Sequence, residues 1–159
     1  MSNQPALESS VDVTATPGEA WAAVTDLRAM RRRSPELVGM WLLGRPKVGR
    51  RGVNLNRRGW FVWPTTSRIT RWKDPAQDGG RGAFAFHVWP TDVEWSYDVE
   101  PTPRGTKVVE RRTALTDPSL SVRLTARLAL GGADSHDAEL LAGMNATLAA
   151  LKSEVETGR

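Results

Sequence analysis

The segment Val93-Glu94-Trp95-Ser96-Tyr97-Asp98-Val99-Glu100 alternates apolar and polar side chains without a break. Strict alternation with a period of two predicts a β-strand with one face buried and the other in water. The buried face would carry Trp95 and Tyr97, whose large rings can line a ligand cavity as well as fill a core. Similar strand patterns surround this segment, and one long helical pattern ends the chain. Their order predicts a cupped sheet closed by a helix, and hence an internal cavity.

The length and composition are those of one globular domain. At 159 residues, the chain is expected to form a single domain over residues 1–159, with residues 1–7 as a loose tail. Hydrophobic residues make up 40% of the chain and charged residues 25%, which is usual for soluble proteins. No stretch approaches the ~18 consecutive apolar residues of a membrane span, and the first residues do not resemble a signal peptide. We therefore expect a cytoplasmic protein.

The residues that most often bind metals are scarce. The chain has no cysteine, which excludes disulfides, thiolate zinc sites and cysteine nucleophiles. Its two histidines, His87 and His136, are far apart and match no metal-binding spacing, so we interpret both as surface residues. Sequence motifs of P-loops, dinucleotide-binding folds, zinc proteases and serine hydrolases are absent. The sequence therefore predicts neither a metal nor a cofactor.

The chain is basic, with a net charge of +4 and a pI of about 10.1. Arginines cluster at positions 31–33, 50–51, 57–58 and 111–112. Such clusters can bind nucleic-acid phosphates, but they also occur on ordinary solvated surfaces. Because acidic residues are interspersed and no RNA-binding motif is present, we favour the solvated surface over a nucleic-acid partner.

A helix start follows the first predicted strand, which covers residues 9–15. Thr16 and Glu19, with proline between them, form the pattern of a capping box, in which each side chain accepts a backbone N–H at the start of a helix. We expect Asp26 to interrupt this helix and a second short helix to run to about Arg33. Pro35 makes the residue before it unfavourable for helix, so the second helix should end there.

The remaining pattern is six strands and a helical C-terminal part. Strands are predicted near residues 36–43, 52–58, 62–73, 81–89, 92–100 and 105–115. The short turns between them imply hairpins and an antiparallel sheet. Pro64 is expected at a strand end or bulge, because proline cannot donate to the ladder. Apolar periodicity then predicts a helix over 119–130 and a long closing helix over about 134–156.

Four segments resemble one known family. TPGEAWAAVTD (residues 16–26) is similar to its first helix, EWSYDVEP (94–101) and GTKV (105–108) to its sixth and seventh strands, and residues 142–152 to its terminal helix. Over residues 9–155 the chain resembles the START-like or Bet v 1-like superfamily, also called SRPBCC, and most of all its bacterial polyketide cyclase/dehydrase-like and lipid-transport-like branch. The resemblance implies an α+β helix-grip fold. In this fold a curved seven-stranded antiparallel sheet wraps around a long C-terminal helix, with two short helices between strands 1 and 2.

In this fold an apolar cavity lies between the sheet and the last helix, and alternation predicts which side chains face it. The predicted ligand-binding residues are Trp63, Thr65, Ser67, Phe84, Phe86, Trp95, Tyr97, Leu141, Met144, Asn145 and Leu148. Each of the large rings could instead be plain core, and Met144 could be a gap filler. Seven tryptophans are many for packing alone, so we expect some to line the cavity or its rim, notably Trp41, Trp60 and Trp63.

Glu110 and Tyr97 are the candidates for catalysis. Glu110 shares a face with Val108, but Val109 competes for the core, so the register is ambiguous. If Glu110 faces inward, burial would raise its pKa, and Arg112 or Arg68 could lower it. The buried acid could then accept a proton from a polyketide-like substrate. We favour the alternative, a cross-strand ion pair of Glu110 on the convex face.

The sequence thus predicts a monomer or homodimer that binds or carries a small hydrophobic molecule, such as a lipid, a polyketide or an aromatic metabolite. The first alternative is a cyclase- or dehydratase-like enzyme that needs no cofactor. The second is an interaction module that uses the basic surface. The same fold hosts all these activities, so the fold alone does not decide among them.

Overall fold

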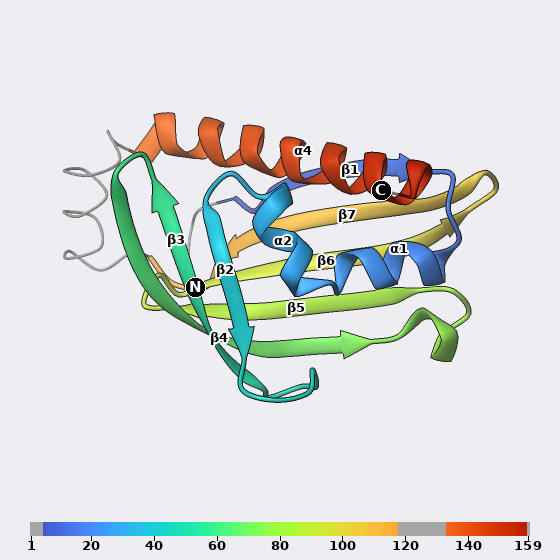
Figure 1. Cartoon of the computed structure of the whole chain (residues 1–159), viewed down its shortest axis with the longest axis horizontal. Coiled ribbons are helices and arrows are strands. Elements are labelled where there is room, and N and C mark those ends of the chain that lie inside the picture. The colour runs from blue at the N-terminus through green and yellow to red at the C-terminus, as the bar shows by residue number, and fades with distance from the viewer. Residues whose placement is uncertain (1–4, 118–132, 159) are drawn as a thin grey trace.

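A computed structural model of the chain describes residues 5–117 and 133–158, with the backbone alone at 133–136 (Figure 1). The elements in chain order are β1 Leu7–Val13, α1 Pro17–Val24, α2 Leu27–Arg33, β2 Leu37–Leu42, β3 Arg51–Arg58, β4 Phe61–Lys73, the short 3-10 helix η1 Pro75–Gln77, β5 Gly82–Trp89, β6 Val93–Thr102, β7 Gly105–Ala114 and α4 Ala133–Thr157. The predicted strands and the closing helix are confirmed to within about two residues. The helix predicted over 119–130 lies outside the described residues.

The strands form one antiparallel sheet of seven, in the order β1-β7-β6-β5-β4-β3-β2. Six of the seven strands therefore follow one another as neighbours, and only β1 joins the far edge, beside β7. The long helix α4 runs alongside β1 and β7, while α1 and α2 lie in front of the sheet (Figure 1). The helix-grip fold, with two short helices between the first two strands, is confirmed.

The two short helices begin where the sequence places their caps. The Thr16 hydroxyl accepts the Glu19 N–H, and the Glu19 carboxylate accepts the Thr16 N–H at 2.8 Å, so the capping box is complete. The Asp26 carboxylate accepts the N–H groups of residues 28 and 29 and thereby caps α2. The predicted interruption at Asp26 is confirmed, and its physical cause is this second cap.

The expectation for Pro64 is wrong. Pro64 lies inside β4 opposite Leu55, in a stretch of the β3–β4 pairing without a register shift. Proline is tolerated there because β5 pairs with β4 only from Thr66 onward, so Pro64 has a strand on one side alone. The irregularity of β4 lies further along, between Ile69 and Arg71.

The hairpin between β6 and β7 is held against the end of β1. Gly105 has a φ of 148°, and a Cβ at this position would lie 2.1 Å from the carbonyl oxygen of Val13. The next side chain, Thr106, is fully buried and donates to the Ala15 carbonyl at 2.7 Å. Only glycine allows this approach, so the glycine–threonine pair fixes the β1–β7 edge of the sheet.

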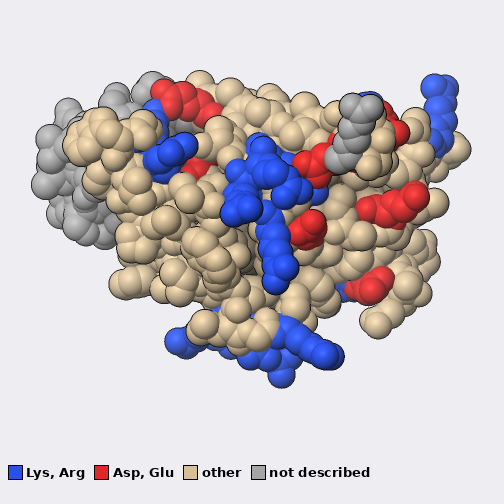
Figure 2. Space-filling view, viewed as in Figure 1, with Lys and Arg blue, Asp and Glu red and all other residues tan. Residues whose placement is uncertain are grey.

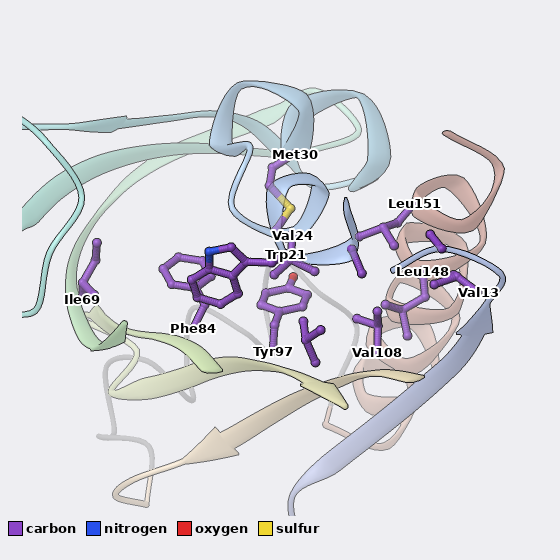
Figure 3. Packing of buried hydrophobic residues seen from close by; sticks show 13 residues of the cluster. Val13, Trp21, Val24, Met30, Ile69, Phe84, Tyr97, Val108, Leu148 and Leu151 are labelled. Carbon is purple, nitrogen blue, oxygen red and sulfur yellow. The ribbon is translucent and has the colours of Figure 1, made fainter. Parts of the chain in front are cut away.

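The apolar core lies at one end of the concave face, between the sheet and the helices (Figure 3). Phe84 and Tyr97 from the sheet, Trp21 and Val24 from α1, and Leu148 from α4 belong to this one cluster of buried side chains. The rings of Phe84 and Tyr97 are stacked with centroids 6.2 Å apart. The core therefore joins the two short helices, α4 and the middle of the sheet into a single packed unit.

Candidate functional site

The strand register arranges the concave side chains in rows that run across the sheet. Phe84, Tyr97, Glu110 and Ser9 form one row, because each is the register partner of the next. Phe86, Trp95, Arg112 and Leu7 form the row beside it, and Val88 and Val93 form part of the row after that. Phe86 and Trp95 lie two residues from Phe84 and Tyr97 on the same strands and therefore share their concave face, which confirms the predicted facing.

The middle row differs from its neighbours in exposure. Phe84 and Tyr97 are 0% and 4% exposed on one side, and Val88 and Val93 are 8% and 3% exposed on the other. In the middle row, Phe86, Trp95, Arg112 and Leu7 are only partly buried, whereas Ile69, the β4 partner of Phe86, is 1% exposed. Water-accessible surface therefore remains on inward-facing rings that are flanked by buried rows.

Glu110 and Tyr97 are hydrogen-bonded in the buried row. The Tyr97 hydroxyl donates to Glu110 Oε1 at 2.7 Å, and Glu110 is 2% exposed. The preferred interpretation of Glu110, an ion pair on the convex face, is therefore wrong. Both Val108 and Val109 are buried, on opposite faces of β7, which is why the apolar pattern did not determine the register.

The second carboxylate oxygen of Glu110 is buried without a hydrogen-bond partner. Burial raises the pKa of Glu110 to about 7, and the hydrogen bond from Tyr97 opposes this rise. The pKa of Tyr97 is raised well above its usual range, first by burial and then by the neighbouring carboxylate. The pair therefore holds one acid that can gain or lose a proton near neutral pH and one phenol that stays protonated.

A buried arginine lies on the helix side of this pair. Arg33 of α2 is 5% exposed, forms an ion pair with Glu154 of α4 at 2.5 Å, and donates to the Ala23 carbonyl at 2.6 Å. Its positive charge acts on Tyr97 by lowering the pKa of the phenol, against the larger effect of burial. Arg33 thus links α1, α2 and α4 above the buried row.

The arginines expected to influence Glu110 act elsewhere. Arg112 is partly buried and its charge interacts with Asp137 and Glu36, while Arg68 is exposed on the outer face. Burial raises the pKa of Glu36, and the charges of Arg58 and Arg112 lower it. Charged groups from the start of β2, from β3, from β7 and from α4 therefore neutralise one another at this end of the sheet.

A polar cluster occupies the concave face of β3 and β4. Thr65 and Ser67 are 5% and 4% exposed, and both are hydrogen-bonded to Asn54, at 3.2 Å each. Asn56 donates to Thr65 at 3.1 Å. The inward facing of Thr65 and Ser67 is confirmed. Asn54 and Asn56 were missed, although both alternate in phase with the inward positions of the predicted strand over 52–58.

The three rim tryptophans lie in different places. Trp63 is partly buried on the concave face and stacks on Phe61, with ring centroids 5.4 Å apart. Trp60 is 93% exposed in the β3–β4 turn. Trp41 is 54% exposed and alternates with the buried Met40, so it lies on the outer face and does not line the concave side.

The closing helix presents a mixed set of predicted side chains. Met144 and Leu148 are 2% and 1% exposed, and Leu148 belongs to the packed core. Leu141 is only partly buried, whereas its neighbour Leu140 is 8% exposed. Asn145 accepts a hydrogen bond from Ser9 of the buried row through its amide oxygen, which fixes α4 to β1.

His87 lies on the outer face and is hydrogen-bonded to Asp92 at 2.6 Å. The side chain of His136 lies outside the described residues. Within residues 5–117 and 137–158, no group of three His, Asp or Glu side chains is placed to hold a metal ion. Among the described helices, none is both long and apolar enough to cross a bilayer.

Comparison with solved structures shows the same fold in proteins of low sequence identity. The protein TTHA0849 from Thermus thermophilus is 16% identical, with a TM-score of 0.66 over 97% of this chain and 99% of that one. A STAR-related lipid transfer protein from Xanthomonas axonopodis is 15% identical, with a TM-score of 0.65 over 93% of this chain and 84% of that one. The di-domain ARO/CYC StfQ of the steffimycin biosynthetic pathway is 15% identical, with a TM-score of 0.69 over 96% of this chain and 50% of that one.

No protein of curated function matches the chain in sequence. The sequence profile described as polyketide cyclase / dehydrase and lipid transport matches residues 4–156, nearly the whole chain. The strand order, the two short helices and the closing α4 agree with that match. The chain belongs to the polyketide cyclase / dehydrase and lipid transport family, within the START-like or Bet v 1-like SRPBCC superfamily.

Proposed function

We propose that this protein binds a small hydrophobic molecule on the concave face of the sheet, beneath α4. The observation that carries the proposal is the partial exposure of Phe86 and Trp95 between two buried rows. Accessible surface on inward-facing rings supports an apolar binding face, because ligand sites are lined mainly by apolar and aromatic side chains.

The composition of this face supports an apolar guest with a few polar groups. Trp95, Phe86 and Trp63 offer ring surface for stacking, while Asn54, Thr65 and Ser67 offer hydroxyl and amide groups. Burial of apolar ligand surface contributes ~25 cal/mol per Å², so about 200 Å² would contribute on the order of 5 kcal/mol. The polar cluster would then orient the guest rather than hold it.

Tryptophan fluorescence can test this proposal directly. Titration with a panel of fatty acids, flavonoids and polycyclic polyketides should quench the emission of the wild-type protein. Trp95→Ala should weaken the best ligand about tenfold, because about 60 Å² of lost apolar contact corresponds to ~1.4 kcal/mol. Trp60→Ala is the matched control, since Trp60 is 93% exposed and should leave the affinity unchanged. Equal losses in both variants, or no response to any ligand, would refute the proposal.

The Tyr97–Glu110 pair favours a second candidate, a cyclase- or dehydratase-like reaction without a cofactor. Glu110 Oε2 could accept a proton from the carbon between two carbonyl groups of a poly-β-carbonyl chain. The carbanion would form a carbon–carbon bond with another carbonyl carbon of the same chain, and the resulting alkoxide would take the proton back from Glu110. Tyr97 would keep the carboxylate oriented through Oε1.

The variant Glu110→Gln separates the two candidates. It keeps the shape of the side chain and an acceptor for Tyr97, so ligand affinity should change by less than about threefold. General acid–base catalysis by a side chain commonly contributes ~100-fold or more, and cyclisation should slow by at least that factor. A variant that turns over a poly-β-carbonyl substrate at the wild-type rate would remove Glu110 from catalysis and leave the binding proposal in place.

A further inference from the structure

The charges of this chain are divided unevenly along the sequence. Residues 37–73, which form β2, β3 and β4, carry nine of the 22 Lys and Arg residues and none of the 18 Asp and Glu residues. The rest of the chain therefore holds 13 basic and 18 acidic residues. Three adjacent strands at one edge of the sheet are thus strongly basic, while the remainder is acidic on balance.

The outer face of the sheet shows this division as a difference in pairing. On the β5–β7 side, Arg111 contacts both Glu8 and Asp98, and Arg71 at the end of β4 lies near Glu94 and Asp98. On the β2–β4 side, five exposed cations have no acidic partner among the described residues: Arg45, Lys47, Arg51, Arg57 and Arg68. Their charge is therefore available to an external anion. Basic side chains gather at the lower edge of the molecule in Figure 2, where the β2–β3 connection lies in Figure 1.

The same strands expose large apolar side chains. Trp41, Leu43, Val48 and Val53 are 54%, 65%, 59% and 41% exposed. Trp41 and Val53 are cross-strand partners on the outer face, and Leu43 and Val48 lie in the β2–β3 connection beside the cations. Apolar and basic side chains are therefore interleaved on one surface, which we call the β2–β4 outer face. Its members are Trp41, Leu43, Val48 and Val53 together with the five unpaired cations.

The β2–β3 connection also contains an open hollow. The hollow has a volume of about 370 Å³, and Leu43, Lys47, Val48, Arg50 and Arg51 are among the residues that line it. The Arg50 guanidinium is held in place by the carbonyls of Leu43 and Arg45, at 2.8 and 3.0 Å. A hollow lined by both cations and apolar side chains suits an anionic head group attached to acyl chains.

We propose that the β2–β4 outer face docks the protein on an anionic bilayer surface, with lipid phosphates at the β2–β3 hollow. Lys and Arg contact the charged head groups, and the indole of Trp41 and the side chains of Leu43 and Val48 enter the interface. A nucleic acid would satisfy the cations but would leave the exposed Leu43, Val48 and Val53 without apolar partners. A second copy of this face would place like charges opposite one another.

The charge arm of the test uses matched double variants. Wild-type protein should co-sediment with phosphatidylcholine vesicles that contain phosphatidylserine, and much less with phosphatidylcholine alone. Lys47→Glu with Arg51→Glu should reduce partitioning by at least roughly 30-fold, since each cation near an anionic surface contributes about fivefold. The control variant, Arg31→Glu with Arg32→Glu on α2, makes the same change in net charge at exposed positions elsewhere. Its vesicle partitioning should fall by no more than about threefold. Equal losses in the two double variants would overturn the proposal.

Substitution of the exposed apolar side chains distinguishes a bilayer partner from a polyanion. Leu43→Ser with Val48→Ser keeps every charge and should reduce vesicle partitioning about tenfold, without changing the thermal unfolding midpoint by more than about 2 °C. Binding of single-stranded RNA that equals or exceeds vesicle binding, with no effect of these two serines, would overturn the proposal in favour of a nucleic-acid surface. Dimerisation lost in Lys47→Glu with Arg51→Glu, without vesicle binding by the wild type, would overturn it in favour of a second copy.

Discussion

The two ends of the concave face are built from the same alternating strands, yet they have different surroundings. At one end, Phe84 and Tyr97 are covered by Trp21 of α1 and Leu148 of α4 and form the packed core. At the other end, Trp95 and Trp63 keep accessible surface. Trp95 lies between Phe86 and Arg112, and Trp63 lies beside the amides and hydroxyls of β3 and β4. The difference shows that alternation determines which way a side chain faces, while the helix above it determines whether that side chain is covered or keeps accessible surface.

The largest expected difference between the two ends is in the stability cost of truncating the two phenylalanines of β5. Phe84 is 0% exposed and Phe86 is partly exposed in the adjacent row. We expect Phe84→Ala to lower the free energy of unfolding by about 4 kcal/mol and Phe86→Ala by about 2 kcal/mol, because a cavity in the packed core cannot refill with water. Urea denaturation at pH 7 measures both. Equal costs would show that the middle row is packed as tightly as the core.

Glu110 should give the second largest effect, and the effect should depend on pH. Its folded pKa is about 7, above its value in the unfolded chain, so the folded state holds a proton that the unfolded state has lost. The contribution of Glu110 to stability is therefore fully present below about pH 4.5 and is lost as the pH rises through 7. At ~1.4 kcal/mol per pKa unit, the loss is on the order of 3 kcal/mol.

Glu110→Gln tests this prediction because it removes the titration and keeps an acceptor for Tyr97. Its free energy of unfolding relative to wild type should rise by on the order of 3 kcal/mol between pH 5 and pH 8. Paired urea denaturation curves at the two pH values measure the change. If the free energies of unfolding of the two proteins differ by the same amount at both pH values, the Glu110 carboxyl group is open to water.

The polar cluster should give the smallest effect. Thr65→Val removes the hydroxyl that accepts from both Asn54 and Asn56, so one buried and one partly buried amide each lose a partner. The expected cost is about 1.5 kcal/mol in thermal or urea unfolding. Thr66→Val, on the exposed outer face of the same strand, should cost less than about 0.5 kcal/mol. A cost for Thr65→Val no larger than the control would mean that water already replaces these bonds.

The sequence predicted the elements well because local chemistry determines them. The capping box at Thr16 and the cap at Asp26 each depend on neighbours a few residues away. Periodicity also placed Phe84, Trp95 and Tyr97 on the concave face correctly. These signals are complete within a window of about ten residues, so one sequence is sufficient to find them.

The site was harder to predict because it depends on partners distant in sequence. Glu110 follows Val109 on β7, and both side chains are buried. Only the pairing of β6 with β7 shows that Glu110 takes the same face as Tyr97. Trp41 was expected at the cavity or its rim because seven tryptophans are many for packing alone, but alternation with Met40 places it on the outer face. Asn54 and Asn56 alternate correctly yet are polar, so an apolar pattern cannot report that Asn54 is buried and Asn56 partly buried.

The link between Arg33 and Glu154 has a consequence for how the closing helix moves. Near that end, Lys152 also donates to the Asp12 carbonyl and Glu156 accepts the Thr14 N–H, so the last turns of α4 are tied to β1 and α2 together. Lifting those turns would strip a buried guanidinium of its counter-ion. Amide deuteration along α4 should therefore be slow beside Leu151 and Glu154, where these contacts gather.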